Sequence, residues 1–187
     1  MKWISIFLLA GALSACSAPP VSTSVNQKEA APHQDRAAML VEQGVEAYLQ
    51  RNDTEAMTIF TQASAAGNIK APRYIGLMYL NGYGVEQNAR RAVAEFNKAA
   101  VQGDATAQYW LAYCYEQGIG IERNNEQALR WYRQVAQSRD AVAAPAMTAL
   151  GRLAEVEQPE TAIEWYQKAA DIGDKEAQAA LARLHDQ

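Results

Sequence analysis

Apolar and small side chains recur at steps of three and four residues from residue 37 to the end of the chain. This spacing gives a helix one apolar face. Ala92, Phe96 and Ala99 illustrate it within one stretch. Short segments rich in Gly and polar residues separate the stretches, and no strand is expected. The pattern predicts helices at 37–50, 53–66, 71–81, 89–102, 107–117, 125–138, 143–156, 159–172 and 175–185.

The helical pattern is itself repeated along the chain. The landmarks Ile75, Gly76, Tyr79, Gly82 and Gly84 recur 36 residues later as Leu111, Ala112, Tyr115, Gly118 and Gly120. The first and fourth units keep the spacing of small and aromatic residues but lack the Gly-x-Gly segment, and Gly151 of the fourth unit stands one position out of register. A single helical hairpin is too small to bury its apolar face alone, so neighbouring hairpins are expected to stack into a solenoid.

The recurring pattern A-x-x-x-L-G-x-x-Y-x-x-G-x-G-V, followed by A-x-x-W/F-Y/F-x-x-A-A-x-x-G-D, resembles the Sel1-like repeat, a relative of the tetratricopeptide repeat. The resemblance covers about residues 37–187. It implies an all-α, right-handed α-solenoid of about four helix-turn-helix repeats plus a C-terminal capping helix. It also implies a concave face, lined by the first helix of each repeat, that binds other proteins.

The first sixteen residues have the character of an export signal. Lys2 precedes an apolar run that is too short to span a bilayer, and the run ends in Leu-Ser-Ala-Cys. This ending resembles the lipobox of bacterial lipoproteins, which implies that residues 1–15 are removed and that Cys16 carries the lipid chains, palmitate among them. Ser17 implies transfer to the outer membrane, with the domain facing the periplasm. The alternative is an ordinary signal peptide with a chance cysteine.

Residues 17–36 contain three of the six prolines and no aromatic side chain, a composition that cannot bury enough apolar area to fold. We therefore expect a lipidated cysteine and flexible tether at 16–36, followed by the repeat domain at 37–187.

The charge and the residue content argue against nucleic-acid binding, catalysis and metal or cofactor binding. The net charge of −4 argues against a nucleic-acid partner. One of the two histidines, His33, lies in the expected tether and the other, His185, near the end of the chain, and no nucleophile–base or phosphate-loop motif occurs. Cys114 is expected to be a buried, inert thiol, with a disulfide to a partner's cysteine as the alternative. The sequence thus predicts no catalytic residue, no metal site and no cofactor.

The free side of the first helix in each repeat is the candidate binding surface. Val41 and Thr148 lie on it, and the residues expected to contact a partner are Val45, Tyr48, Arg73, Leu77, Leu80, Tyr109, Tyr113, Glu116 and Arg152. Tyr and Arg dominate many binding energies, and two aromatic residues four positions apart on one helix are typical of a contact surface. The alternative is that neighbouring helices or the tether cover these side chains.

These observations predict a monomeric, membrane-anchored interaction module that acts as a scaffold or assembly factor for envelope proteins. An enzyme acting on cell-wall fragments or β-lactams, as proposed for cysteine-rich relatives, is one alternative, and a surface-displayed host-interaction protein is another. A self-associating structural protein is disfavoured by the polar residues of the last half-unit.

Overall fold

The computed structural model describes residues 27–185, which form helices and connecting segments without a strand. The helices are α1 (Gln27–Leu49), α2 (Asp53–Ala65), α3 (Ala71–Asn81), α4 (Ala89–Ala100), α5 (Ala105–Gln117), α6 (Asn125–Ala136), α7 (Ala143–Ala154), α8 (Pro159–Asp171) and α9 (Lys175–His185). Apart from the start of α1, their ends agree with the sequence prediction to within two residues. The periodicity therefore located the elements correctly.

Helix α1 begins ten residues earlier than predicted, at Gln27. The second half of the expected tether, residues 27–36, is therefore helical, and the prediction of a flexible segment is wrong there. Six of these residues are Gln, Lys, Glu or Ala, which have high helix propensities, and these propensities outweigh the polar, proline-containing composition. The signal segment 1–15, Cys16 and residues 17–26 lie outside the described residues.

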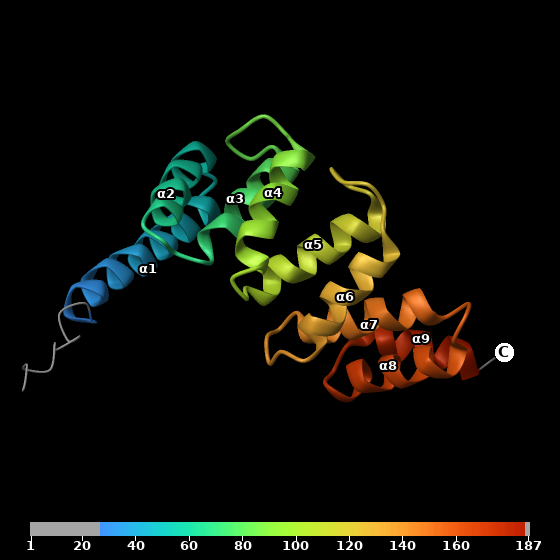
Figure 1. Ribbon diagram of the computed structural model, residues 1–187. Coiled ribbons are helices and arrows are strands. Elements are labelled where there is room, and N and C mark those ends of the chain that lie inside the picture. The colour runs from blue at the N-terminus through green and yellow to red at the C-terminus, as the bar shows by residue number, and fades with distance from the viewer. Residues whose placement is uncertain (1–26, 186–187) are drawn as a thin grey trace, which may run out of the picture.

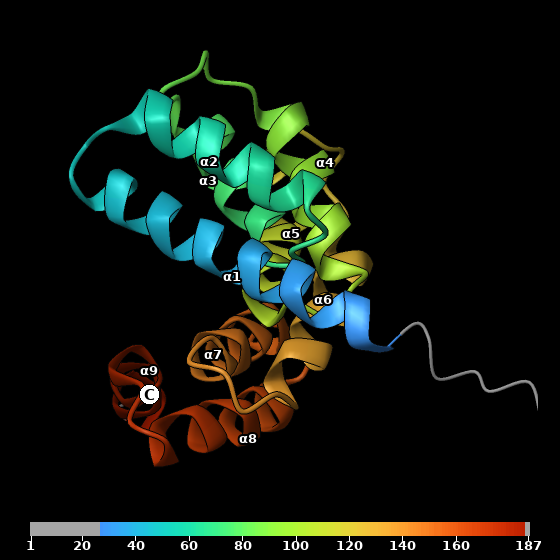
Figure 2. The same cartoon turned by 90° about the vertical axis from the view of Figure 1, so that its left-hand side faces the viewer.

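Each helix packs mainly against the helices before and after it in the chain. The result is an all-α solenoid that winds from α1 to α9 (Figure 1). Figure 2 shows α2 on the outer side of α1 and α8 on the outer side of α7. We therefore call α1, α3, α5, α7 and α9 the inner helices, and α2, α4, α6 and α8 the outer helices.

One contact between a small and an aromatic residue recurs in the repeats. A Cβ atom added to Gly76 would lie 2.6 Å from the ring of Phe96, which is buried in α4. Gly44 meets the ring of Phe60 in the same way at 2.6 Å. The small residue of the inner helix thus lets the aromatic ring of the outer helix approach its backbone.

The fourth repeat keeps this contact, because Gly151 meets the ring of Tyr166 at 2.7 Å. Gly151 is therefore in structural register, and the prediction that it is displaced is wrong. The connection between α7 and α8 is shorter than its counterparts in the second and third repeats, and this shortening changes the sequence spacing without moving the contact.

In the second and third repeats, a Gly-x-Gly segment joins the inner helix to its outer helix and also docks on the preceding repeat. Gly118 ends α5 in the left-handed conformation, with φ of 70°. Gly120, with φ of 69°, lies so close to the start of α4 that a Cβ atom would overlap the carbonyl oxygen of Ala89. A residue with a side chain would be strained there by its backbone angles and by this contact.

None of the helices between residues 27 and 185 combines the length and the apolar character needed to cross a bilayer.

Candidate functional site

The small residue that contacts the outer helix fixes a common register for the inner helices. Relative to Gly44, Gly76, Ala112 and Gly151, three positions share one side of the helix: three residues before, one after and four after. We call these positions the inner face. Its members are Val41, Val45 and Tyr48 in α1; Arg73, Leu77 and Leu80 in α3; Tyr109, Tyr113 and Glu116 in α5; and Thr148 and Arg152 in α7, with Glu155 directly after it.

All nine predicted contact residues occupy these register positions. The same register adds Glu155, which the sequence prediction did not include. Glu155 occupies the same register position as Glu116, but the apparent displacement of Gly151 concealed this equivalence in the sequence.

The first half of the inner face is apolar and contains a hollow. Val45, Tyr48, Leu77 and Leu80 are partly buried and pack against the cores of the first two repeats. Between α1 and α3 a recess of about 530 Å³ is lined by Ala38, Val41, Glu42, Val45, Asn68, Ile69, Lys70, Arg73 and Tyr74. The positions of α3 that correspond to Val41 and Val45 carry the larger side chains of Arg73 and Leu77. The recess therefore follows from the small valines of α1.

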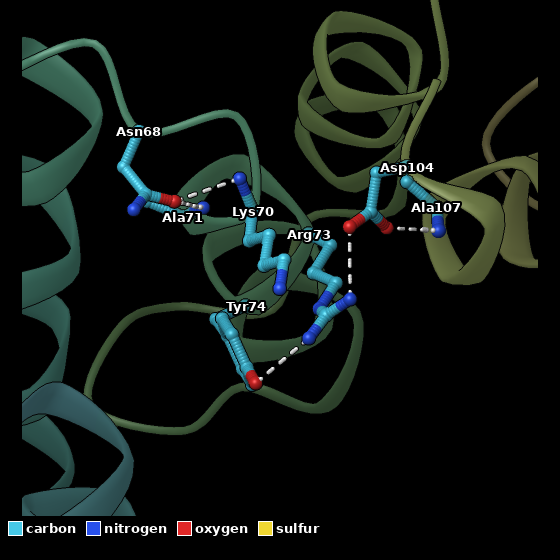
Figure 3. Close-up of polar contacts among 7 residues, drawn as sticks. All are labelled: Asn68, Lys70, Ala71, Arg73, Tyr74, Asp104 and Ala107. Carbon is cyan, nitrogen blue, oxygen red and sulfur yellow. Dashed lines mark hydrogen bonds and ion pairs between the residues drawn. The ribbon is translucent and has the colours of Figure 1, made fainter. Parts of the chain in front are cut away.

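Arg73 forms one wall of this recess and is held from two sides (Figure 3). Its guanidinium donates to Oδ2 of Asp104 at 2.8 Å and to the hydroxyl of Tyr74 at 2.9 Å. The Tyr74 ring in turn stacks on Phe60 with a centroid distance of 4.6 Å. Arg73 is therefore positioned before any partner arrives, which reduces the entropy that binding would cost.

The middle of the inner face is aromatic. Tyr109 and Tyr113 make edge contacts with the ring of Trp110, at centroid distances of 6.0 and 5.8 Å. Tyr109 also lies 5.6 Å from Tyr132 of α6, and burial raises the pKa of its hydroxyl. Both tyrosines are half-buried. Neighbouring side chains thus cover part of each ring, and the remainder faces outward.

The second half of the inner face is polar and rests on a buried carboxylate. Glu116 is only 3% exposed and accepts hydrogen bonds from the Tyr132 hydroxyl at 2.9 Å and from both terminal nitrogens of Arg152. The hydrogen bond to Glu116 raises the pKa of Arg152. Burial, together with the nearby carboxylate, raises the pKa of the Tyr132 hydroxyl far above its usual range.

The expectation that Glu116 contacts a partner needs correction. Its carboxylate is buried and already bonded, because the α5 helix turns it toward α6 and α7 rather than outward. Its function on this surface is to hold Arg152, whose side chain remains 45% exposed.

The same three-residue arrangement occurs one repeat later. Glu155 accepts from the Tyr166 hydroxyl and from Arg183 of α9, each at 2.8 Å. The hydrogen bond from Arg183 lowers the pKa of Glu155. A second recess of about 490 Å³ opens between α7 and α9 beside this arrangement. Two tyrosine–glutamate–arginine sets therefore present two arginines at successive repeats.

Residues that begin the inner helices add a further link, which the sequence analysis did not assign. Asp104 and Asp174 each accept a hydrogen bond from a backbone N–H in the first turn of their own helix. Each also accepts from the preceding inner helix, Asp104 from Arg73 and Asp174 from Thr148. The Gly-Asp pair before each of these helices is the sequence signal for such a cap.

Other chemistry is sparse in the described part of the chain. Cys114 is a buried free thiol, and burial raises its pKa to about 11. Such a thiol carries little of the nucleophilic thiolate at neutral pH. Among residues 27–185 there is no group of three His, Cys, Asp or Glu side chains that could hold a metal ion.

Comparison with known proteins identifies the repeat. The Sel1 repeat model matches residues 34–68, 71–104, 105–140 and 144–174. No protein of curated function matches the chain.

Several solved structures resemble the fold. A Sel1 repeat protein from Oxalobacter formigenes is 35% identical with a TM-score of 0.70, and the match covers 79% of this chain and 60% of that one. The protein c5321, a protective antigen of uropathogenic Escherichia coli displaying an SLR fold, is 28% identical with a TM-score of 0.72, covering 83% of this chain and 35% of that one. This chain therefore spans less than two thirds of either relative.

The cysteine-rich protein B of Helicobacter pylori is 19% identical with a TM-score of 0.51, covering 65% of this chain and 97% of that one. At this identity the likeness concerns the fold alone.

Proposed function

Because this chain belongs to the Sel1 repeat family, whose members serve as protein-interaction scaffolds, we propose that it is a membrane-anchored adaptor for another cell-envelope protein. The partner lies along the inner face, and the lipid on Cys16 holds the complex at the outer membrane, facing the periplasm. The adaptor carries no catalytic residue of its own and acts by fixing the position of its partner.

The observation that carries this proposal is the fixed geometry of the inner-face side chains. Arg73 and Arg152 are each held by an acidic residue that is at most 5% exposed, and both arginines keep part of their surface free. Tyr109 and Tyr113 are held against Trp110. Rigid tyrosine and arginine side chains contribute much of the energy in protein interfaces, and little ordering is left to be done on binding.

The inner face has an apolar first half and a polar second half, and this order indicates which kind of partner segment would fit it. A helix or extended segment of the partner would place apolar side chains in the recess between α1 and α3, where Val41 and Val45 are small. Farther along, the same segment would offer hydrogen-bond acceptors to Arg152 and Arg183.

Crosslinking in intact cells, followed by mass spectrometry, tests the binding surface. The Tyr109→Ala/Tyr113→Ala variant should lose the partner that the native protein captures. Arg130→Ala/Arg133→Ala is the matched control, because both arginines are exposed on the outer helix α6. A partner retained by the tyrosine variant and lost by the control would place the contact on the outer side instead.

The anchor is tested separately with Cys16→Ser. Metabolic labelling with a clickable palmitate analogue should mark the native protein and leave the variant unlabelled, and fractionation should move the variant from the membrane to the soluble periplasm. An unlabelled native protein would refute lipidation without touching the proposal for the inner face.

A second candidate, display on the cell surface and contact with a host, draws on the relative described as a protective antigen. Protease treatment of intact cells separates the two. An adaptor facing the periplasm stays intact until the outer membrane is opened, whereas a displayed protein is degraded at once.

A further inference from the structure

Helix α9 repeats a motif of α5 but does not bury it in the same way. The motif is Asp-x-x-Ala-Gln-x-x-Leu-Ala, and it stands as Asp104, Ala107, Gln108, Leu111 and Ala112 at α5 and as Asp174, Ala177, Gln178, Leu181 and Ala182 at α9.

The polar members of the two motifs form the same bonds. Each Asp caps its own helix. Gln108 donates to the carbonyl of Ala100 at the end of α4, and Gln178 donates to the carbonyl of Ala170 at the end of α8, with distances of 3.0 and 3.4 Å. Helix α9 is therefore placed on α8 as α5 is placed on α4.

The motifs differ in what covers them. In α5 every motif residue is buried, and Ala112 shares a core with Ala128, Tyr132, Val135 and Ala136 of the outer helix α6. In α9 the residues Gln178 and Ala182 are exposed, and Leu181 is only partly buried. Among the described residues, no outer helix lies over α9 as α6 lies over α5.

The outer helices also expose an apolar side chain beside α9 that is more buried in the earlier repeats. Val93 of α4 is 9% exposed, and its counterpart Leu129 in α6 lies in one crevice with Thr161 and Trp165 of α8, the next outer helix. The counterpart in α8, Ile163, is 44% exposed and borders a small recess with Leu181 and Leu184 of α9. An outer helix placed over α9 would lie beside Ile163 as α8 lies beside Leu129.

We infer that this uncovered side of α9, with Ile163 of α8, is a second docking surface, which receives an amphipathic helix of a protein partner. The surface continues the series of interfaces between inner and outer helices within the chain, and α6 therefore defines the chemistry of the occupant. The helix of the partner carries an alanine, an aromatic residue four positions later, and small apolar residues three and four positions after the aromatic one. In α6 this pattern is formed by Ala128, Tyr132, Val135 and Ala136. The aromatic ring of the partner helix rests on Ala182. This surface is separate from the inner face.

A peptide with the sequence of residues 122–138 of this chain, labelled with a fluorophore, is the probe. Titration of the mature protein should raise the anisotropy of the peptide. Ala182→Glu should weaken binding by about tenfold or more, because the carboxylate occupies the seat of the aromatic ring. The same loss is expected for a peptide in which Tyr132 is replaced by Ala.

Ala179→Glu is the matched control. It introduces the same charge in the same helix, but Ala179 lines the recess on the inner face, so affinity for the peptide should change less than about twofold. Both alanines are exposed, so both variants should fold, as circular dichroism verifies. Ala179→Glu also probes the inner face, which keeps failure of this inference distinguishable from failure of the proposed function.

Three results would overturn the inference. The first is binding by Ala182→Glu that equals that of the native protein. The second is the absence of binding up to about 1 mM peptide. The third is a concentration-dependent dimer in sedimentation that Ala182→Glu dissolves, since the occupant would then be a second copy of this chain.

Discussion

Replacing Glu116 by leucine would remove the one carboxylate that links α5, α6 and α7. The variant deletes the acceptor of the Tyr132 hydroxyl and of both terminal nitrogens of Arg152. Leucine itself suits the position, because Leu80 occupies it in the preceding repeat. The cost should therefore come from the two partners left without an acceptor.

The two partners contribute unequally. The Tyr132 side chain is fully buried, and an unsatisfied buried hydroxyl costs about 1–3 kcal/mol. Arg152 is 45% exposed, so water can replace most of its lost bonds and its share is about 0.5 kcal/mol. We expect Glu116→Leu to lower the free energy of unfolding by about 2–3 kcal/mol.

A compensated variant tests the cause of that loss. Adding Tyr132→Phe and Arg152→Met removes both unsatisfied partners, and Phe96 already shows that phenylalanine fits at the ring position. Replacing a buried ion pair by well-packed apolar residues is often neutral, so the triple variant should return to within about 1 kcal/mol of the native protein.

Urea unfolding, followed by circular dichroism, measures these differences. Glu164→Leu in α8 is the control, because Glu164 is exposed, and it should change stability by less than about 0.5 kcal/mol. The reasoning is refuted if Glu116→Leu is as stable as the native protein. It is also refuted if the triple variant is no more stable than the single one.

Three further predictions concern other parts of the chain. Gly120→Ala should destabilise the protein by more than about 2 kcal/mol in thermal unfolding, because the new methyl group would both strain the backbone and overlap with α4. Gly103→Ala is the comparison: this glycine also has a positive φ but lies in open space, so the substitution should cost only about 1 kcal/mol. The Cys114 thiol, with its pKa raised to about 11 and its side chain buried, should react with a thiol reagent at pH 8 only after urea unfolding; a rapid reaction of the folded protein would contradict its burial. The pKa of Glu155 is lowered in the folded state, so the carboxylate stabilises the fold above the ordinary glutamate pKa range, and this stabilisation is lost as the pH falls through the folded pKa. Arg183→Met should therefore reduce the dependence of stability on pH in this range, and an unchanged slope would refute the assignment.

The repeat architecture could be predicted because its signals are local. A helix needs an apolar face at a period of 3.6 residues, and Gly82 and Gly118 mark helix ends by a conformation that other residues avoid. The start of α1 was missed because composition suggested a tether, although residues 27–36 include several good helix formers.

The sequence by itself determined the positions of the helices, their stacking order and the side of each inner helix that faces away from its outer helix. Only the tertiary structure decided which residues of that side are free. Glu116 and Arg152 are 36 residues apart in the chain, and they meet because consecutive inner helices lie side by side. A carboxylate on a helix face has the same local pattern whether it meets solvent or a guanidinium from the next repeat. Burial and pairing depend on the distance between repeats, which periodicity within one helix does not contain.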